Sequence, residues 1–271
     1  FYELTARAGL AAAAAVVAPT RGALADLRAS FGAALDRVPV TAVIANGMDL
    51  AAWPQPGERR KRSYAAAAGR LWDEGKQIHL VCQPGLAMPM KIAGPGAPPT
   101  AGAAAPGMPP GGGSLPAGVS WAGELDPGAM KDFLAGAAVF VLPSRYEPFG
   151  LGALEAALSG CALLLNDIPS LREVWGRAAA YFGGGSRELA AALAALAASP
   201  RRRRALADAA ARRARARYGA TRMAEQYAGM YARLMGRAGE RALSDAGATA
   251  PSLPARPLAA RNSPALARNP M

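Results

Sequence analysis

The stretch from residue 139 to 165 constrains the fold of this chain more than any other part. It begins with a short apolar run, 139–142, whose β-branched and aromatic residues predict a buried strand. Proline and glycine then interrupt the pattern, and from about Gly150 apolar residues recur at helical spacing. A second apolar run, 162–165, predicts another strand. A strand, helix and strand in this order form a βαβ unit, so we expect an α/β protein with a parallel sheet flanked by helices.

The loop of this unit carries residues suited to ligand chemistry. Glu147 ends the loop and Glu155 lies inside the predicted helix, with seven residues between them. Gly150 allows the backbone to approach a ligand closely, and the first helical turn offers free N–H groups and a partial positive charge that suit a phosphate. Ligands of open α/β sheets bind at the carboxyl ends of the strands, which is where this loop lies.

The string EPFGL at 147–151, followed by Glu155, resembles a known signature. It is similar to the E-x7-E motif of retaining glycosyltransferases of the two-domain GT-B fold, in the large glycogen-synthase-like and mannosyltransferase-like group, family 4. The longer string 143–155, followed by the run 167–175, resembles one bacterial branch of that group. The resemblance implies a Rossmann-like sheet, the C-terminal half of a GT-B fold. It also implies transfer of a sugar from a nucleotide-diphosphate sugar to an acceptor, with the anomeric configuration retained.

The resemblance also implies a role for each residue of the motif. Glu155 would accept hydrogen bonds from the ribose hydroxyls of the donor, since a carboxylate suits a vicinal diol. Glu147 would lie near the transferred sugar. Phe149, Gly150 and Leu151 would present backbone N–H groups to the distal phosphate and the sugar.

A second part of the site is expected after the strand predicted at 64–68. The residues Gly69, Arg70 and Lys76 resemble the segment that opens the C-terminal domain in the family. Taken alone, the two cations would be read as ordinary surface residues. Beside the motif, they would grip the diphosphate and stabilise the charge that grows on the leaving group. The catalytic residues are therefore expected to be Glu147, Arg70 and Lys76, with no cofactor and no metal.

The net charge of +12 leaves other classes of function open. The segment 200–218 carries eight arginines and one acid, and its runs 201–204 and 212–217 define an alternative, a module that binds nucleic acid or an anionic surface. No interleaved aromatic residues or nucleic-acid motif accompany this charge. Nucleic acid is therefore not an expected partner, whereas weak association with a membrane surface stays open. A non-catalytic glycosyltransferase remnant is the third alternative.

The few histidine and cysteine residues argue against other chemistry. His79 is the single histidine, and Cys82 and Cys161 are far apart without metal-ligand spacing. A Ser-His-Asp triad, a metal cluster and a disulfide framework are therefore not expected. A reducing, cytoplasmic location fits the absence of a disulfide framework. The apolar stretch at 9–18 is much shorter than the roughly 20 residues of a membrane span.

The chain begins in what reads as mid-domain sequence, and we expect a fragment. The expected parts are the tail end of an N-terminal acceptor domain at 1–50, a linker at 51–63, the nucleotide-sugar-binding domain at 64–219 with a flexible insertion at 94–117, a crossing helix at 220–236 and a disordered tail at 237–271. With most of the acceptor domain missing, the chain alone should turn over little or no substrate. The donor sugar, its base and the acceptor are not specified.

Local signals predict where several elements begin and end. Thr20 and Asp126 are expected to be helix N-caps, the second with proline at the first helical position. Ser186 is expected to cap a helix at 188–198, and another helix is expected to begin at Lys76. Asn46-Gly47 predicts a tight turn.

Overall fold

The computed structural model describes residues 2–53, 63–96 and 114–247. By its internal contacts the chain divides into two units, 1–229 and 230–271, and the first contains every strand of the described residues. Most of the expected linker and insertion, and the tail beyond 247, lie outside the described residues.

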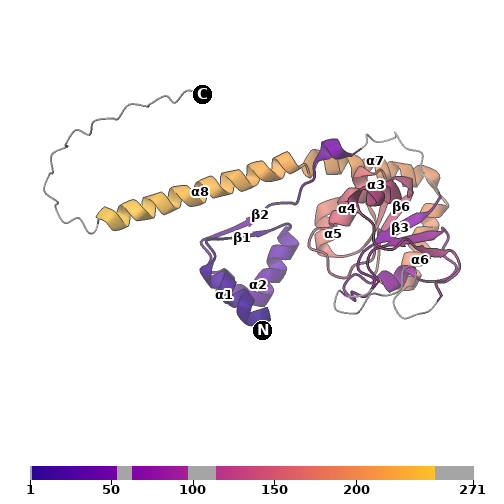
Figure 1. Ribbon diagram of the computed structural model, residues 1–271, viewed down its shortest axis with the longest axis horizontal. Helices are drawn as coiled ribbons and strands as arrows, with labels where there is room; N and C mark the ends of the chain where they lie inside the picture. Colours follow the sequence, from indigo (N-terminus) through magenta and orange to yellow (C-terminus); the bar gives the residue numbers. More distant parts are fainter. Residues whose placement is uncertain (1, 54–62, 97–113, 248–271) are drawn as a thin grey trace, which may run out of the picture. The chain divides into compact units, whose positions relative to one another are not determined.

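Six parallel strands form the main sheet of the first unit (Figure 1). They are β3 (Ala65–Ala68), β4 (Met90–Ala93), β5 (Val119–Trp121), β6 (Val139–Leu142), β7 (Ala162–Asn166) and β8 (Ala180–Phe182). Their order is β5-β4-β3-β6-β7-β8, so the chain builds outward from β3 in one direction and from β6 in the other. The predicted α/β class and the predicted βαβ unit are confirmed. The crevice where the strand order reverses, between β3 and β6, is where ligands of such sheets bind.

Helices cover both faces of the sheet. They are α3 (Pro127–Gly136), α4 (Leu151–Leu158), α5 (Pro169–Trp175), α6 (Ser186–Ala197) and α7 (Pro200–Arg217), with short 3-10 turns η2 (Ile78–Val81) and η3 (Gly176–Ala178). Alternate residues of β6 point to opposite faces, Phe140 toward the core under α4 and α5, and Val141 toward the core under α6 and η2. Because both faces are buried, the strands read as continuous apolar runs.

The first fifty residues form a small layer of their own. The elements α1 (Tyr2–Ala12), β1 (Ala15–Ala18), α2 (Arg21–Leu35) and β2 (Val40–Val43) follow in the predicted order, and β1 pairs in parallel with β2. Thr20 is the predicted N-cap of α2, and its side chain accepts a hydrogen bond from the backbone N–H of Ala23 at 3.0 Å. Asp126 caps α3 in the same way, at 2.9 Å from the N–H of Ala129.

The predicted tight turn at Asn46-Gly47 is wrong. The chain runs extended there, and Met48 forms a parallel bridge with Gly219. The Met48 N–H donates to the Tyr218 carbonyl at 2.9 Å, and the Met48 carbonyl accepts from the Ala220 N–H at 2.8 Å. A Cβ on Gly47 would lie 2.5 Å from the Gly219 carbonyl oxygen, so glycine is needed here for close approach rather than for a turn.

Three further local predictions are wrong. No α-helix follows Lys76, because Gln77 takes a left-handed conformation at φ 49° and only the 3-10 turn η2 comes after it. Ser186 does not cap α6, which begins at that residue with Gly185 as its N-cap. The last helix, α8 (Ala220–Gly247), extends eleven residues into the tail that was expected to be disordered from 237. Among the described residues, no helix is long and apolar enough to cross a bilayer.

Candidate functional site

Two loops meet at the crevice between the carboxyl ends of β3 and β6. The loop 69–77 follows β3, and the loop 143–150 follows β6. The Arg145 N–H donates to the Gly75 carbonyl at 3.0 Å, which joins the two loops directly. Behind them the Asn166 side chain at the end of β7 donates to the Ser144 carbonyl at 3.1 Å. The two segments predicted to form one site are thus held side by side.

The Lys76 and Glu147 side chains form an ion pair across these loops. The Lys76 Nζ lies 2.7 Å from the Glu147 Oε2, with 26% and 13% of the two side chains exposed. The other carboxylate oxygen of Glu147 accepts from the Gly150 N–H at 3.1 Å, and the Glu147 carbonyl accepts from the Ser170 hydroxyl at 2.6 Å. Glu147 therefore fixes the loop conformation, and it also keeps the amino group of Lys76 in the crevice.

Arg70 pairs with Asp73, an acid for which no role was predicted from the sequence. The Arg70 guanidinium donates to the Asp73 carboxylate and lies 5.4 Å from the ring centre of Trp72. Partial burial raises the pKa of Asp73, but hydrogen bonds from Arg70 and the Gly75 N–H, with the charges of Arg70 and Lys76, lower it overall. The residues Arg70, Asp73, Lys76 and Glu147 form one group, which we call the charged cluster. The short spacing of Asp73 from Gly75, typical of an Asx turn, is a sequence signal that could have indicated Asp73.

Glu155 lies apart from the charged cluster. It lies in the second turn of α4, half-buried, and its carboxylate makes no hydrogen bond and no ion pair within the described residues. Burial raises the pKa of this carboxyl above its usual value of 4.5, and the charge of Lys131 on α3 opposes the rise. A partly desolvated carboxylate without a partner is poised to accept hydrogen bonds from a ligand.

The remaining predicted residues shape the backbone around the crevice. Gly150 is the N-cap of α4 at φ 86°, a left-handed conformation that favours glycine. Leu151 begins the helix with 46% of its surface exposed, and its N–H has no partner among the described residues. Phe149 is buried, with its ring edge-on to Tyr218 at 5.2 Å, so its side chain serves packing. Gly69 donates from its N–H to the Ala93 carbonyl at 3.0 Å.

Several arginines of the basic helix α7 have structural partners. Arg213 donates to the Glu173 and Val174 carbonyls near the end of α5, and Arg203 donates to the Leu196 and Ala197 carbonyls at the end of α6. Cations at helix C-termini satisfy free carbonyls and oppose the negative end of the helix dipole. Part of the charge that suggested an anionic-surface module therefore stabilises the fold. Among the described residues, no group of three or more His, Cys, Asp or Glu side chains is placed to hold a metal ion.

Comparison with known proteins identifies the class to which this site corresponds. Residues 114–213, which include the loop 143–150 and α4, match the family model described as "Glycosyl transferases group 1". This part of the chain is therefore similar to a glycosyltransferase family domain. Two curated relatives are an alpha-maltose-1-phosphate synthase of Mycolicibacterium smegmatis, 30% identical over 186 residues, and a glycogen synthase of Mycobacterium tuberculosis, 32% identical over 151 residues.

The alignments cover part of each protein. The first spans 62% of this chain and 47% of the relative, and the second spans 53% and 35%. Among solved structures, sucrose-phosphate synthase from Thermosynechococcus elongatus matches with a TM-score of 0.68 and 20% identity, over 87% of this chain and 62% of that one. HepE from Anabaena, solved in complex with UDP and glucose, matches with a TM-score of 0.66 and 16% identity, over 85% and 66%. The fold is therefore that of GT-B glycosyltransferases, and this chain spans about half the length, or less, of the curated relatives it matches.

Proposed function

We propose that this chain supplies the donor-binding half of a retaining glycosyltransferase of family 4, which transfers a sugar from a nucleotide-diphosphate sugar to an acceptor. The observation that carries the proposal is the Lys76–Glu147 pair, which brings residues 71 positions apart to the crevice at the strand-order reversal. The family match over the same loop and the UDP bound by HepE support the same ligand class.

In this proposal each part of the site acts on a different part of the donor. Glu155, which has no partner among the described residues, accepts hydrogen bonds from the ribose hydroxyls. The free N–H at Leu151 and the start of α4 face the distal phosphate. Gly69, Gly150 and the backbone of Phe149 let the donor approach closely, and no metal or cofactor is assigned to the reaction.

The charged cluster acts as the bond between the sugar and the diphosphate breaks. Negative charge then grows on the leaving phosphate, while the acceptor oxygen forms the new bond to the sugar and passes its proton to an oxygen of that phosphate. Lys76 and Arg70 exchange their internal partners, Glu147 and Asp73, for phosphate oxygens, and this stabilises the departing group. Glu147, released from Lys76, then lies near the transferred sugar.

The test is calorimetric titration with UDP-, GDP- and ADP-glucose. We expect one of them to bind, and Glu155→Gln to weaken it about tenfold, because charged hydrogen bonds to the ribose are lost. Glu124→Gln is the matched control, an exposed glutamate on the stretch that follows β5. The proposal fails if none of the three donors binds, or if both variants bind the donor as tightly as the unmodified chain.

A separate expectation concerns catalysis by the chain alone. A cleft between two domains needs both walls, and residues 1–50 supply only a small layer around two strands. We propose that this chain by itself turns over little or no donor and that it works in the cytoplasm, where the thiols of Cys82 and Cys161 stay reduced. Measured sugar transfer by the isolated chain at a rate usual for enzymes would contradict the first point.

A further inference from the structure

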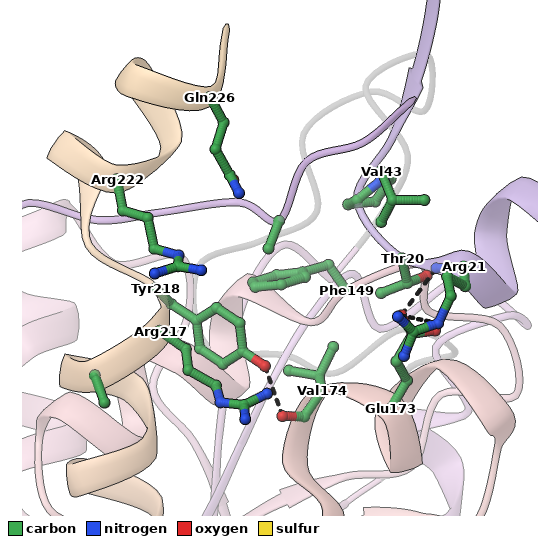
Figure 2. A pocket seen from close by; sticks show the side chains of 13 residues that line it. Thr20, Arg21, Val43, Phe149, Glu173, Val174, Arg217, Tyr218, Arg222 and Gln226 are labelled. Carbon is green, nitrogen blue, oxygen red and sulfur yellow. Dashed lines mark hydrogen bonds and ion pairs between the residues drawn. The ribbon is translucent and has the colours of Figure 1, made fainter. Parts of the chain in front are cut away.

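A cavity lies beside the loop that carries Glu147. It has a volume of about 480 Å³, within the range of small-molecule sites. Its walls come from the start of α2, the residues after β2, the end of α5 and the junction of α7 with α8, and Phe149 contributes from the loop. Figure 2 shows Arg217 and Arg222 on one side of the cavity and Arg21 with Glu173 on the other.

The acidic side chain of the cavity is already neutralised. Both carboxylate oxygens of Glu173 accept hydrogen bonds at 3.0 Å from backbone N–H groups at the start of α2, those of Arg21 and Gly22. The Arg21 side chain adds an ion pair, with its Nε 3.6 Å from the Glu173 Oε1. The positive end of α2 and this guanidinium therefore balance the negative charge of Glu173. The Glu173 carboxylate does not neutralise the arginines of the opposite wall.

The two arginines of the opposite wall are not balanced. Arg217 ends α7 and Arg222 lies in the first turn of α8, both exposed, and neither forms an ion pair or a side-chain hydrogen bond within the described residues. Two guanidinium groups on one wall repel each other weakly and attract an anion. Their planar forks match the oxygens of a phosphate.

The cavity adjoins the proposed donor site through its floor. Phe149 and Tyr218 meet edge-to-face at 5.2 Å, and the Tyr218 hydroxyl donates to the Val174 carbonyl at 2.7 Å. The Thr20 hydroxyl donates to the carbonyl of Pro148 at 2.9 Å, which ties the wall of the cavity to the loop between Glu147 and Gly150. A ligand in the cavity would therefore lie beside the loop that holds the donor.

We propose that this cavity binds a phosphate-bearing small molecule of the size of a sugar phosphate, with the phosphate on Arg217 and Arg222 and the hydroxylated part toward Phe149. The molecule is the acceptor of the transfer, an assignment that rests on the proposed function. The binding itself rests on the cavity and its unbalanced charges alone.

The test uses glucose 6-phosphate as the probe and glucose as its uncharged counterpart, titrated into the full chain by calorimetry. The double variant Arg217→Ala/Arg222→Ala should lose at least about tenfold in affinity for glucose 6-phosphate. The matched control is Arg201→Ala/Arg212→Ala, which removes the same charge from exposed positions of α7 outside the cavity. Circular dichroism checks that each variant folds, and Arg222→Gln replaces the double variant if that one does not.

The results separate this inference from the proposed function. Equal affinity for glucose 6-phosphate in the two double variants, or equal binding of glucose and glucose 6-phosphate, overturns the inference. The donor among UDP-, GDP- and ADP-glucose that binds the unmodified chain reports on the donor site, and its affinity should not change in Arg217→Ala/Arg222→Ala. If none of the three donors binds while glucose 6-phosphate binds, the donor proposal fails and the phosphate cavity stands. If the double variant also loses affinity for the donor, the cavity belongs to the donor, and its assignment to the acceptor is wrong.

Discussion

The charged cluster and the cavity lined by Arg217 and Arg222 adjoin the same loop, 143–150, but their charged groups differ in whether they have internal partners. In the charged cluster every ionised group has an internal partner, Lys76 with Glu147 and Arg70 with Asp73. In the cavity, Glu173 is satisfied by the start of α2, whereas Arg217 and Arg222 face open space without partners among the described residues.

The difference shows what each charge contributes to the stability of the fold before any ligand binds. A partly buried ion pair orders two loops, and removing one member leaves the other desolvated and uncompensated. An exposed guanidinium without a partner contributes almost nothing to the free energy of folding. The cluster should therefore be sensitive to mutation in stability measurements, and the cavity wall should be sensitive only in binding measurements.

The largest expected effect is on the backbone that frames the cluster. Gly94, at the end of β4, has φ 128°, and a Cβ there would lie 2.0 Å from the Gly69 carbonyl oxygen, one residue before Arg70. Gly94→Ala should lower the free energy of unfolding by about 3 kcal/mol or more, because backbone rather than a flexible side chain blocks the methyl group. Urea unfolding monitored by circular dichroism measures this change in the free energy of unfolding.

The control for this change lies beside the cavity. A Cβ on Gly22 would meet Ser170 atoms at 3.6 Å or beyond, an ordinary contact, and its backbone N–H would keep its bond to Glu173. Gly22→Ala should change the stability by no more than about 0.5 kcal/mol. Equal destabilisation by the two substitutions would contradict the close backbone contact at Gly94.

The second effect concerns the ion pair itself. Lys76→Ala removes the partner of Glu147, of which 13% is exposed, and should cost about 2 kcal/mol, less than for a fully buried pair because water reaches the site. Arg217→Ala, in the cavity, should cost close to nothing in the same urea experiment. If Lys76→Ala is as stable as Arg217→Ala, then the ion pair does not order the two loops.

The central part of this fold could be predicted from the sequence, because its signals are local. The run 139–142, the helix after Gly150 and the strand at 162 each follow from residues within one element. The same holds for Asp126 with proline after it, where cap and helix formed as expected. Only the resemblance to a family, however, placed Lys76 with Glu147.

The errors arose where distant contacts override local preference. Asn46-Gly47 is a turn sequence, yet the strand-like bridge of Met48 to Gly219, from the far end of the unit, holds it extended. The contact of Glu173 with the start of α2 spans 151 residues, and no local sequence pattern at either end indicates it. Arg217 and Arg222 could not be told from the other arginines of a basic stretch, because a partner or its absence is visible only in three dimensions.

The third effect is a dependence on pH at Glu155. Burial raises the pKa of this carboxyl in the folded state, so between the usual value of 4.5 and the raised one the folded chain holds a proton that the unfolded chain has lost. The contribution of Glu155 to stability therefore falls as the pH rises through that window. Glu155→Gln does not titrate, so its stability relative to the unmodified chain should increase from pH 4 toward neutrality. Parallel curves for the two proteins would contradict the burial of a charge here.

The smallest effect should come from the strained residue that precedes η2. Gln77 adopts φ 49°, a conformation that glycine and asparagine tolerate better than glutamine does. Gln77→Gly should raise the free energy of unfolding by about 0.5–1 kcal/mol, since it relieves strain in the loop that carries Lys76. Gln77→Ala keeps the strain and should give no gain. Because the loop holds three of the four residues of the charged cluster and no part of the cavity, any change in ligand affinity should be confined to the nucleotide donor, with glucose 6-phosphate bound as before.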